Sequence, residues 1–263
     1  MIRRQELQLQ CKKMSEIQSP RLLALGDSAW TIEFGSSIDP LIHSRVQGFC
    51  AALRNEAKLS NEILEYLPSF RSVTIYFDAE KVNASTLGSQ LLALAQNSGN
   101  QISQGRKLCI PVCFENEFGP DLEEVAQLKN ISKNEVIELM TSSIFSVYMI
   151  GFLPGFPYLG GLPEKLNVPR LATPRTLVPA GSIAIAAGMC AAYPWDSPGG
   201  WRLLGQTPIP LFNANNEHHP ALIAPGDQIQ WRPINKDQYS ELKIECQRGN
   251  WERDSILVIQ DWS

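Results

Sequence analysis

Aromatic side chains alternate with glycine and proline in one loop, and this loop carries the strongest chemical signal in the chain. It runs Gly151-Phe-Leu-Pro-Gly-Phe-Pro-Tyr-Leu-Gly-Gly161. Such a loop is stiff, and its glycines let the backbone approach a bound partner closely. Two interpretations follow from the residues alone. The loop is either the wall of a pocket or subunit interface, or a packed structural loop.

Three arginines follow this loop, at Arg170, Arg175 and Arg202, in a stretch whose only acids are Glu164 and Asp196. The planar guanidinium group suits a carboxylate or phosphate, because it can donate two parallel hydrogen bonds. The arginines therefore favour an anionic ligand, with three ordinary surface arginines as the alternative.

Self-contained catalytic motifs are missing from the sequence, which has no phosphate-binding loop, nucleophile elbow or zinc-protease helix. We interpret all three histidines, His43 and the pair His218-His219, as ordinary surface residues. Cys109 and Cys113 lie four apart on an expected strand but have no second ligand pair at metal spacing. They are expected to be buried thiols, and no metal is predicted.

Composition is that of an ordinary globular enzyme or binding protein: 263 residues, 44% hydrophobic, 19% charged, with a net charge of -4. This balance gives no reason to expect a nucleic acid or an anionic membrane as partner. We find no secretory signal or apolar stretch of membrane-spanning length, so the expectation is a soluble cytoplasmic protein with reduced cysteines.

The first half of the chain alternates strand and helix signals. Residues 21–25 and 30–34 flank a Gly-Asp-Ser turn and predict a β-hairpin. Asp39 and Pro40 are typical of the start of a helix, residues 72–77 predict a strand, and residues 84–95 predict a second helix. After a polar tail at 1–20, these elements indicate a small α+β domain at 21–97.

A Gly-, Asn- and Ser-rich linker at 98–106 is the best domain boundary, although one large β-rich domain remains possible. Beyond it we expect a strand at 108–114, helices at 121–128 and 132–141 (the second with a capping box from Ser132 and Glu135), and a strand at 144–152.

Gly or Pro occupies 17 of the 55 residues from Gly151 to Gly205, which excludes regular helix there. Short apolar pieces at 182–187, 201–204 and 229–231 indicate a β-barrel domain at 107–234. The extension at 235–263 predicts a helix at 236–247 and a strand at 256–259.

Four motifs in order resemble one family: the loop from Gly151 to Pro163, Thr173-Pro-Arg175, Val178-Pro-Ala-Gly-Ser182 and Ser197-Pro-Gly-Gly-Trp201. They are similar to those of the B subunit of 5-oxoprolinase, whose family is also described as allophanate hydrolase subunit 1 or the sporulation-kinase inhibitor. The resemblance extends over about Arg21 to Ile234. It implies an α+β N-terminal domain followed by a cyclophilin-like β-barrel domain.

The resemblance also implies a function. A member of this family works beside a homologous second subunit and a third component in the ATP-dependent opening of 5-oxoproline to glutamate, and related modules form half of the carboxyltransferase site of urea carboxylase. The leading hypothesis is therefore a non-autonomous 5-oxoprolinase subunit. The complex would use ATP, and this chain alone would bind no cofactor. A regulatory protein that inhibits a sensor histidine kinase is the alternative, and a prolyl isomerase is the weakest hypothesis, because fold does not determine function.

Some positions depart from the family pattern. Where the family has Leu-His-Ser and then a Tyr, this chain has Leu139-Met-Thr141 and Phe145. Where the family has Gln-Thr-Gly, this chain has Met189-Cys-Ala191. We expect Met140 and Met189 to lie close together and line a barrel cavity that has lost its polar groups. No catalytic residue is assigned. The predicted substrate or partner pocket comprises Phe152, Pro154, Gly155, Phe156, Tyr158, Arg170, Arg175, Met140, Met189, Tyr193, Pro198, Gly199, Gly200 and Trp201.

Overall fold

A computed structural model describes residues 18–98 and 105–257. The chain divides into two compact units, residues 1–103 and 104–263. Most of the predicted tail (1–17) and of the predicted linker (99–104) lies outside the described residues. Within the described part of the chain, no helix combines the length and apolar character needed to span a membrane.

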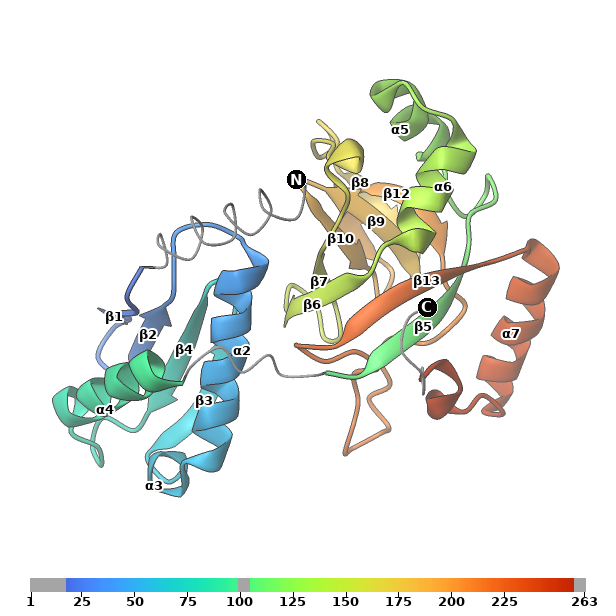
Figure 1. The fold of residues 1–263 in the computed structure, drawn as a ribbon. Coiled ribbons are helices and arrows are strands. Elements are labelled where there is room, and N and C mark those ends of the chain that lie inside the picture. The colour runs from blue at the N-terminus through green and yellow to red at the C-terminus, as the bar shows by residue number, and fades with distance from the viewer. Residues whose placement is uncertain (1–17, 99–104, 258–263) are drawn as a thin grey trace, which may run out of the picture. The chain divides into compact units, whose positions relative to one another are not determined.

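The first unit contains a four-stranded antiparallel sheet in the order β1-β2-β4-β3 (Figure 1). Its strands are β1 (Arg21–Ala24), β2 (Ala29–Glu33), β3 (Ile63–Pro68) and β4 (Ser72–Phe77). The antiparallel pairing of β1 with β2 confirms the predicted hairpin. The helices are α2 (Pro40–Asn55), α3 (Ala57–Ser60) and α4 (Ala84–Asn97). Asp39 caps α2 by accepting a hydrogen bond from the Leu41 N–H (2.8 Å), as its position before Pro40 predicts.

A closed seven-stranded barrel forms the second unit, in the order β10-β7-β6-β13-β5-β12-β9. The strands are β5 (Lys107–Cys113), β6 (Phe145–Ile150), β7 (Pro157–Gly160), β9 (Ser182–Ala186), β10 (Met189–Ala192), β12 (Arg202–Gln206) and β13 (Gln228–Ile234). The pair β5–β13 is parallel and the other neighbours are antiparallel. The predicted β-barrel is confirmed, whereas its similarity to cyclophilins stays a prediction.

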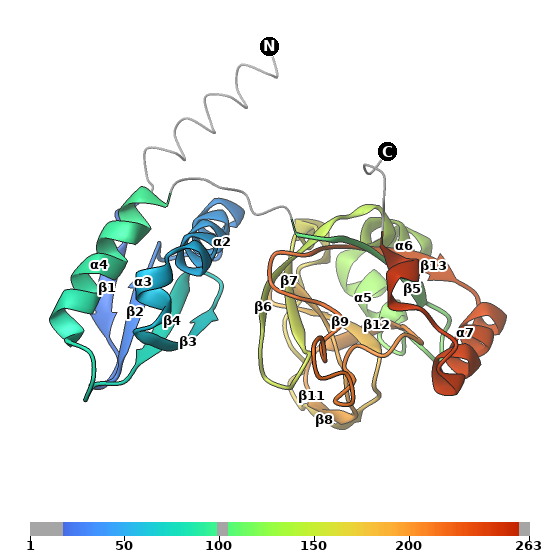
Figure 2. The same cartoon turned by 90° about the horizontal axis from the view of Figure 1, so that it is seen from below.

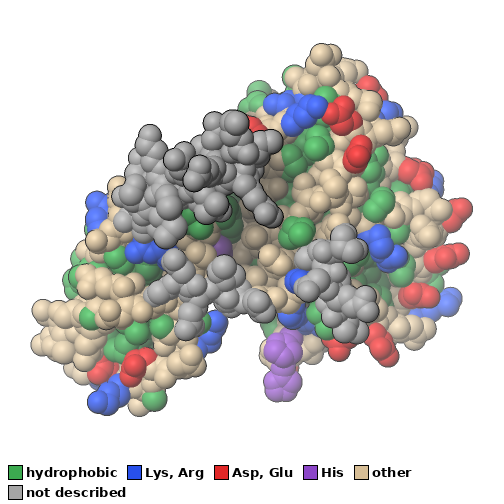
Figure 3. Space-filling model, viewed as in Figure 1, with side chains coloured by type: hydrophobic (Ala, Val, Ile, Leu, Met, Phe, Trp, Pro, Cys, Tyr) green, Lys and Arg blue, Asp and Glu red, His purple; other side chains and the backbone are tan. Residues whose placement is uncertain are grey.

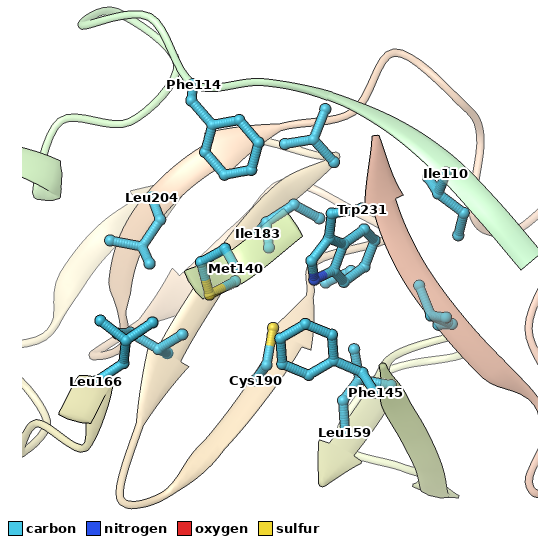
Figure 4. Close-up of a cluster of buried hydrophobic side chains, with 14 of the residues drawn as sticks. Ile110, Phe114, Met140, Phe145, Leu159, Leu166, Ile183, Cys190, Leu204 and Trp231 are labelled. Carbon is cyan, nitrogen blue, oxygen red and sulfur yellow. The ribbon is translucent and has the colours of Figure 1, made fainter. Parts of the chain in front are cut away.

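Alternate residues of these strands point into the barrel and form its dry core (Figure 4). Helices α5 (Leu122–Lys129) and α6 (Lys133–Ser142) contribute Leu122, Val136 and Met140 to the same core. The predicted capping box of α6 is only half present. Ser132 Oγ accepts from the Glu135 N–H (3.1 Å), but the Glu135 carboxylate forms an ion pair with Lys165.

A two-stranded ribbon of β8 (Arg175–Val178) and β11 (Ser197–Gly199) lies outside the barrel order (Figure 2). In the Gly- and Pro-rich segment the only helical piece is a short 3₁₀ turn, η1 (Glu164–Leu166), among the fully described residues 151–205. The expected exclusion of α-helix there is confirmed.

The extension folds as α7 (Lys236–Arg248) followed by the 3₁₀ turn η2 (Arg253–Ile256). The predicted strand at 256–259 is wrong at its start, because Ile256 ends η2 and is buried against the barrel core. Leu257 makes one isolated bridge with Leu108, and residues 258–259 lie outside the described part.

Candidate functional site

Four aromatic rings meet on the outer face of the barrel sheet. Phe156 is the centre, with ring centroids 5.1 Å from Tyr158, 5.0 Å from Tyr193 and 6.4 Å from Trp201. The Tyr193 and Trp201 rings stand edge-on to the Phe156 ring, which is a favoured geometry for aromatic pairs. We call these residues, together with Phe152, Met189 and Arg170, the aromatic face.

Alternation along β9 and β10 explains where the aromatic face lies. Ile183 and Ile185 of β9 point into the barrel core, whereas Ala184 and Ala186 pack under the aromatic rings. On β10, Ala191 likewise contacts the ring cluster. These small side chains leave room for large rings on the sheet.

Phe152 is the exposed end of this cluster. Its side chain is 61% exposed and its ring centroid lies 5.3 Å from that of Phe156. Its backbone has φ 70°, in the left-handed region that bulky side chains rarely adopt. A strained, exposed aromatic residue is an observation that favours a functional role over simple packing.

The interior members of the loop are not exposed. Phe156 is only 2% exposed, and Pro157 is also buried. Truncating Phe156 would therefore damage packing as well as any partner contact. The half-buried Tyr158 and the exposed Phe152 and Pro154 are the loop residues that a ligand or partner can reach.

Arg170 is the accessible cation of the aromatic face. It is exposed, and its guanidinium carbon lies 5.7 Å from the centroid of the Trp201 ring.

Burial raises the pKa of Tyr158, and the Arg170 charge opposes that rise. Burial also raises the pKa of Tyr193, with the neighbouring Tyr158 adding to the effect. Both phenols therefore remain protonated hydrogen-bond donors near neutral pH.

Arg175 and Arg202 do not offer free guanidinium groups to a ligand, which corrects the prediction for both. Arg175 Nη2 lies 2.5 Å from Asp121 Oδ1. Arg202 is 7% exposed, and its Nη1 lies 2.5 Å from Glu124 Oε1. Arg175 of the ribbon and Arg202 of the barrel are therefore both paired with acids at the start of α5. Sequence reasoning did not find these pairs, because the acids lie more than fifty residues away from the arginines.

Two predicted glycines have clear steric roles beside the rings. A Cβ at Gly199 would lie 2.3 Å from Tyr193 Oη, so any larger residue would displace the phenol. Gly155 has φ 79° and packs against Phe212. A Cβ at Gly200 would lie 3.5 Å from the Pro174 ring, which is an ordinary contact distance. Pro198 is exposed on the ribbon.

Met140 and Met189 are not neighbours in one cavity, so that prediction is wrong. Met140 is fully buried in the barrel core, whereas the half-buried Met189 packs on the aromatic face. Because β10 alternates, it is Cys190 that shares the core with Met140 (Figure 4). The two methionines therefore lie on opposite faces of the barrel sheet.

Phe145 and Cys190 join Met140 in this core around Trp231. The rings of Phe145 and Trp231 are 5.9 Å apart, and the Trp231 indole nitrogen points toward the Cys190 thiol (Figure 4). Among the described residues, that N–H finds no nitrogen or oxygen partner. Three of the positions that depart from the family pattern thus belong to one fully buried cluster.

The remaining candidates lie elsewhere. His43 was expected on the surface but is buried, with its Nε2 3.0 Å from Gln47 Nε2. His218 and His219 are exposed, as expected. Cys113 is buried and Cys109 half-buried, and burial raises the pKa of both thiols. The described residues contain no group of three His, Cys, Asp or Glu side chains that could hold a metal ion.

The predicted pocket leaves out three residues of this region, namely Trp195, Ser197 and Phe212. Trp195 is 42% exposed, donates from Nε1 to the Pro154 carbonyl (3.2 Å) and has its ring centroid 5.6 Å from that of Phe212. Ser197 pairs with Val178 across the ribbon, and its buried hydroxyl has no partner among the described residues. Trp195 directly follows Pro194 and Phe212 lies two residues after Pro210, so both could have been found as aromatics close to prolines.

Comparisons with known proteins agree with this architecture. The model of the family described as carboxyltransferase domain, subdomain C and D, matches residues 20–223. The chain is 36% identical to the B subunit of 5-oxoprolinase from Bacillus subtilis (strain 168), over 84% of this chain and 95% of that protein.

Solved structures show the same fold. The crystal structure of TTHA0988 matches with a TM-score of 0.69 at 29% identity, over 79% of this chain and 40% of that chain. Kluyveromyces lactis urea carboxylase matches with a TM-score of 0.71 at 22% identity, over 89% of this chain and 23% of that chain, and shows the fold alone. The chain therefore spans less than half the length of both solved proteins.

The barrel and the match over residues 20–223 define a carboxyltransferase-type domain of subdomains C and D. Within that class, the chain belongs to the family of the 5-oxoprolinase B subunit, also described as allophanate hydrolase subunit 1. The predicted family is confirmed.

Proposed function

We propose that the chain is a non-autonomous subunit of an ATP-dependent amidohydrolase that opens 5-oxoproline to glutamate. One observation carries the proposal: the similarity to a B subunit of 5-oxoprolinase extends over 95% of that relative's length. The aromatic face supports it, because this face is built from the loop and ribbon motifs that carry the resemblance.

The side chains of the aromatic face explain why the chain would need partners. Tyr158 and Tyr193 supply neutral phenols and Arg170 supplies a positive charge. These groups can bind and orient a small substrate that contains a carboxylate or an amide carbonyl. Within this fully described face there is no imidazole, thiol or carboxylate to act as a base. A partner would therefore supply the base, and a further component would handle ATP.

The homologous second subunit is the partner we propose for the exposed edge of the aromatic face. Phe152, Pro154 and Trp195 form this edge, and aromatic residues are enriched at protein interfaces. Related modules also occur inside longer chains, since this chain matches only part of TTHA0988 and of urea carboxylase. The substrate site would then be completed where the two subunits meet.

Co-expression of the chain with the second and third components, followed by an assay of ATP-dependent glutamate release from 5-oxoproline, tests the proposal. The complex should release glutamate, and the chain alone should not. Tyr158→Phe and Arg170→Gln should lower the activity of an assembled complex by about tenfold or more, as expected when a hydrogen bond to a charged group is lost. Tyr239→Phe and Arg248→Gln, which change helix α7 outside the aromatic face, should have no effect at neutral pH.

Two results would contradict this function. Turnover by the isolated chain would show that the site is complete without partners. An assembled complex that releases no glutamate, together with binding of the chain to a sensor histidine kinase, would favour the regulatory alternative instead.

A further inference from the structure

The C-terminal extension is fastened to the outside of the barrel by specific contacts. At the start of α7 the Lys236 N–H donates to Glu115 Oε1 (2.9 Å), and the Tyr239 ring lies 4.4 Å from that of Phe118. At the other end, Arg253 donates hydrogen bonds to the carbonyls of Ala221 (2.5 Å) and Leu222 (2.9 Å). The extension therefore packs on the outside of the barrel, beside strands β5 and β13 (Figure 1).

A cavity of about 370 Å³ lies between this wall and the barrel. Apolar and polar residues both line it, and the apolar ones include Pro111 from β5, Leu242 from α7 and Trp251. Small-molecule sites in proteins have volumes of about 300–1,000 Å³ and mostly apolar linings with a few placed polar groups. The cavity has this size, although polar residues make up half of its lining, more than such sites usually have. Helices α7 and η2 lie beyond the family match at residues 20–223.

Charges of both signs reach the cavity from three different elements. Arg232 comes from β13, Glu245 from α7 and Glu252 from the turn before η2. Among residues 18–98 and 105–257, none of these three side chains forms an ion pair or a hydrogen bond, and Glu252 does not cap η2. Arg232 and the two glutamates are all exposed residues that line one cavity without forming ion pairs with one another. Elsewhere on the face seen in Figure 3, acidic and basic side chains of this unit are intermingled.

We propose that this cavity binds a free α-amino acid, with preference for one that has a cationic side chain. Arg232 would bind the ligand carboxylate, and Glu245 and Glu252 would bind its ammonium groups, as charge-assisted hydrogen bonds require. One arginine and two glutamates give the lining a formal charge of -1, so a ligand of charge +1 is its complement. The Trp251 ring and Leu242 would contact the aliphatic part. This site is independent of the proposed 5-oxoprolinase function.

Calorimetric titration of the full chain with L-lysine, L-leucine, L-glutamate and cadaverine tests the proposal. L-lysine should bind most tightly and L-glutamate most weakly, while cadaverine, which lacks the carboxylate, should bind less tightly than L-lysine. Arg232→Gln and Glu245→Gln should each weaken L-lysine binding by about tenfold, which is about 1.4 kcal/mol. Glu241→Gln is the matched control on α7 and should bind like the parent.

Tryptophan fluorescence gives a second readout. L-lysine should change the emission of the parent, and Trp251→Phe should remove that change while circular dichroism remains unaltered. The proposal is overturned if L-lysine does not bind, if Arg232→Gln binds it as the parent does, or if L-glutamate binds more tightly than L-lysine.

Discussion

The Asp121 carboxylate accepts hydrogen bonds from the Arg175 side chain and from the Leu203 backbone N–H at the same time. One carboxylate oxygen lies 2.5 Å from Arg175 Nη2, and the other accepts the Leu203 N–H at 2.7 Å. The Asp121 side chain is only 6% exposed. This single carboxylate therefore connects ribbon strand β8, barrel strand β12 and the start of helix α5.

Asp121→Ala should destabilise the second unit by about 3 kcal/mol, because it leaves a partly buried guanidinium and a buried N–H without their acceptor. Urea unfolding followed by tryptophan fluorescence measures the loss. Glu138→Ala, an exposed acid on the neighbouring helix α6, is the control and should change stability little. Equal stability of the Asp121 variant and this control would show that the carboxylate is not a structural connection.

Phe152→Gly should be more stable than Phe152→Ala by about 1 kcal/mol. Both variants lose the ring contact with Phe156, but only glycine adopts φ 70° without strain. Both should weaken binding of the second subunit to a similar extent, as measured by calorimetry. If Ala is as stable as Gly, the strain at this residue is absent. If both variants bind the second subunit normally, Phe152 is not an interface residue.

Met140→His should lower stability by about 1–3 kcal/mol and should not raise 5-oxoprolinase activity, because the imidazole would enter a dry core. Burial would lower the pKa of that imidazole, so the folded state would bind fewer protons than the unfolded state. Stability should then fall further as the pH drops below about 6.5. Met140→Leu is the control and should cost less than about 1.5 kcal/mol. A gain of activity in the histidine variant would restore the catalytic interpretation of this position.

Tyr239→Phe should reduce the loss of stability at alkaline pH. Burial, and then the nearby Cys113 thiol, raise the pKa of Tyr239 from 10.0 to about 12. A raised pKa stabilises the fold below pH 10, and this contribution disappears as the pH rises toward 12. The free energy of unfolding, measured by urea titration at several pH values, should therefore decline less steeply in the variant. Parallel curves would contradict the assignment.

Local signals predicted most helices and strands because their causes are local. Asp39 before Pro40 and Ser132 before α6 cap their helices in the structure as expected. The aromatic loop was likewise visible as a sequence motif. The predicted pocket residues Phe156, Tyr158, Tyr193 and Trp201 do come together.

The errors have non-local causes. Arg175 was assigned to a ligand because its partner Asp121 is 54 residues away in sequence. Met140 of α6 and Met189 of β10 were placed together because the sequence did not show which face of β10 Met189 occupies, and a shift of one residue reverses the face. His43 was assigned to the surface because its burial depends on packing against distant segments, such as the Phe70 carbonyl that lies 3.3 Å from its Nδ1.

The position of β5 between β12 and β13 sets the order in which a growing chain can complete this unit. Strand β5 ends at Cys113, yet both of its barrel neighbours, β12 and β13, begin only at Arg202 and Gln228. During synthesis, about ninety residues must therefore emerge before either edge of β5 can be paired, a delay that leaves an apolar strand open to association with other chains. Chaperone binding to nascent chains that end between these strands is the expected biological consequence.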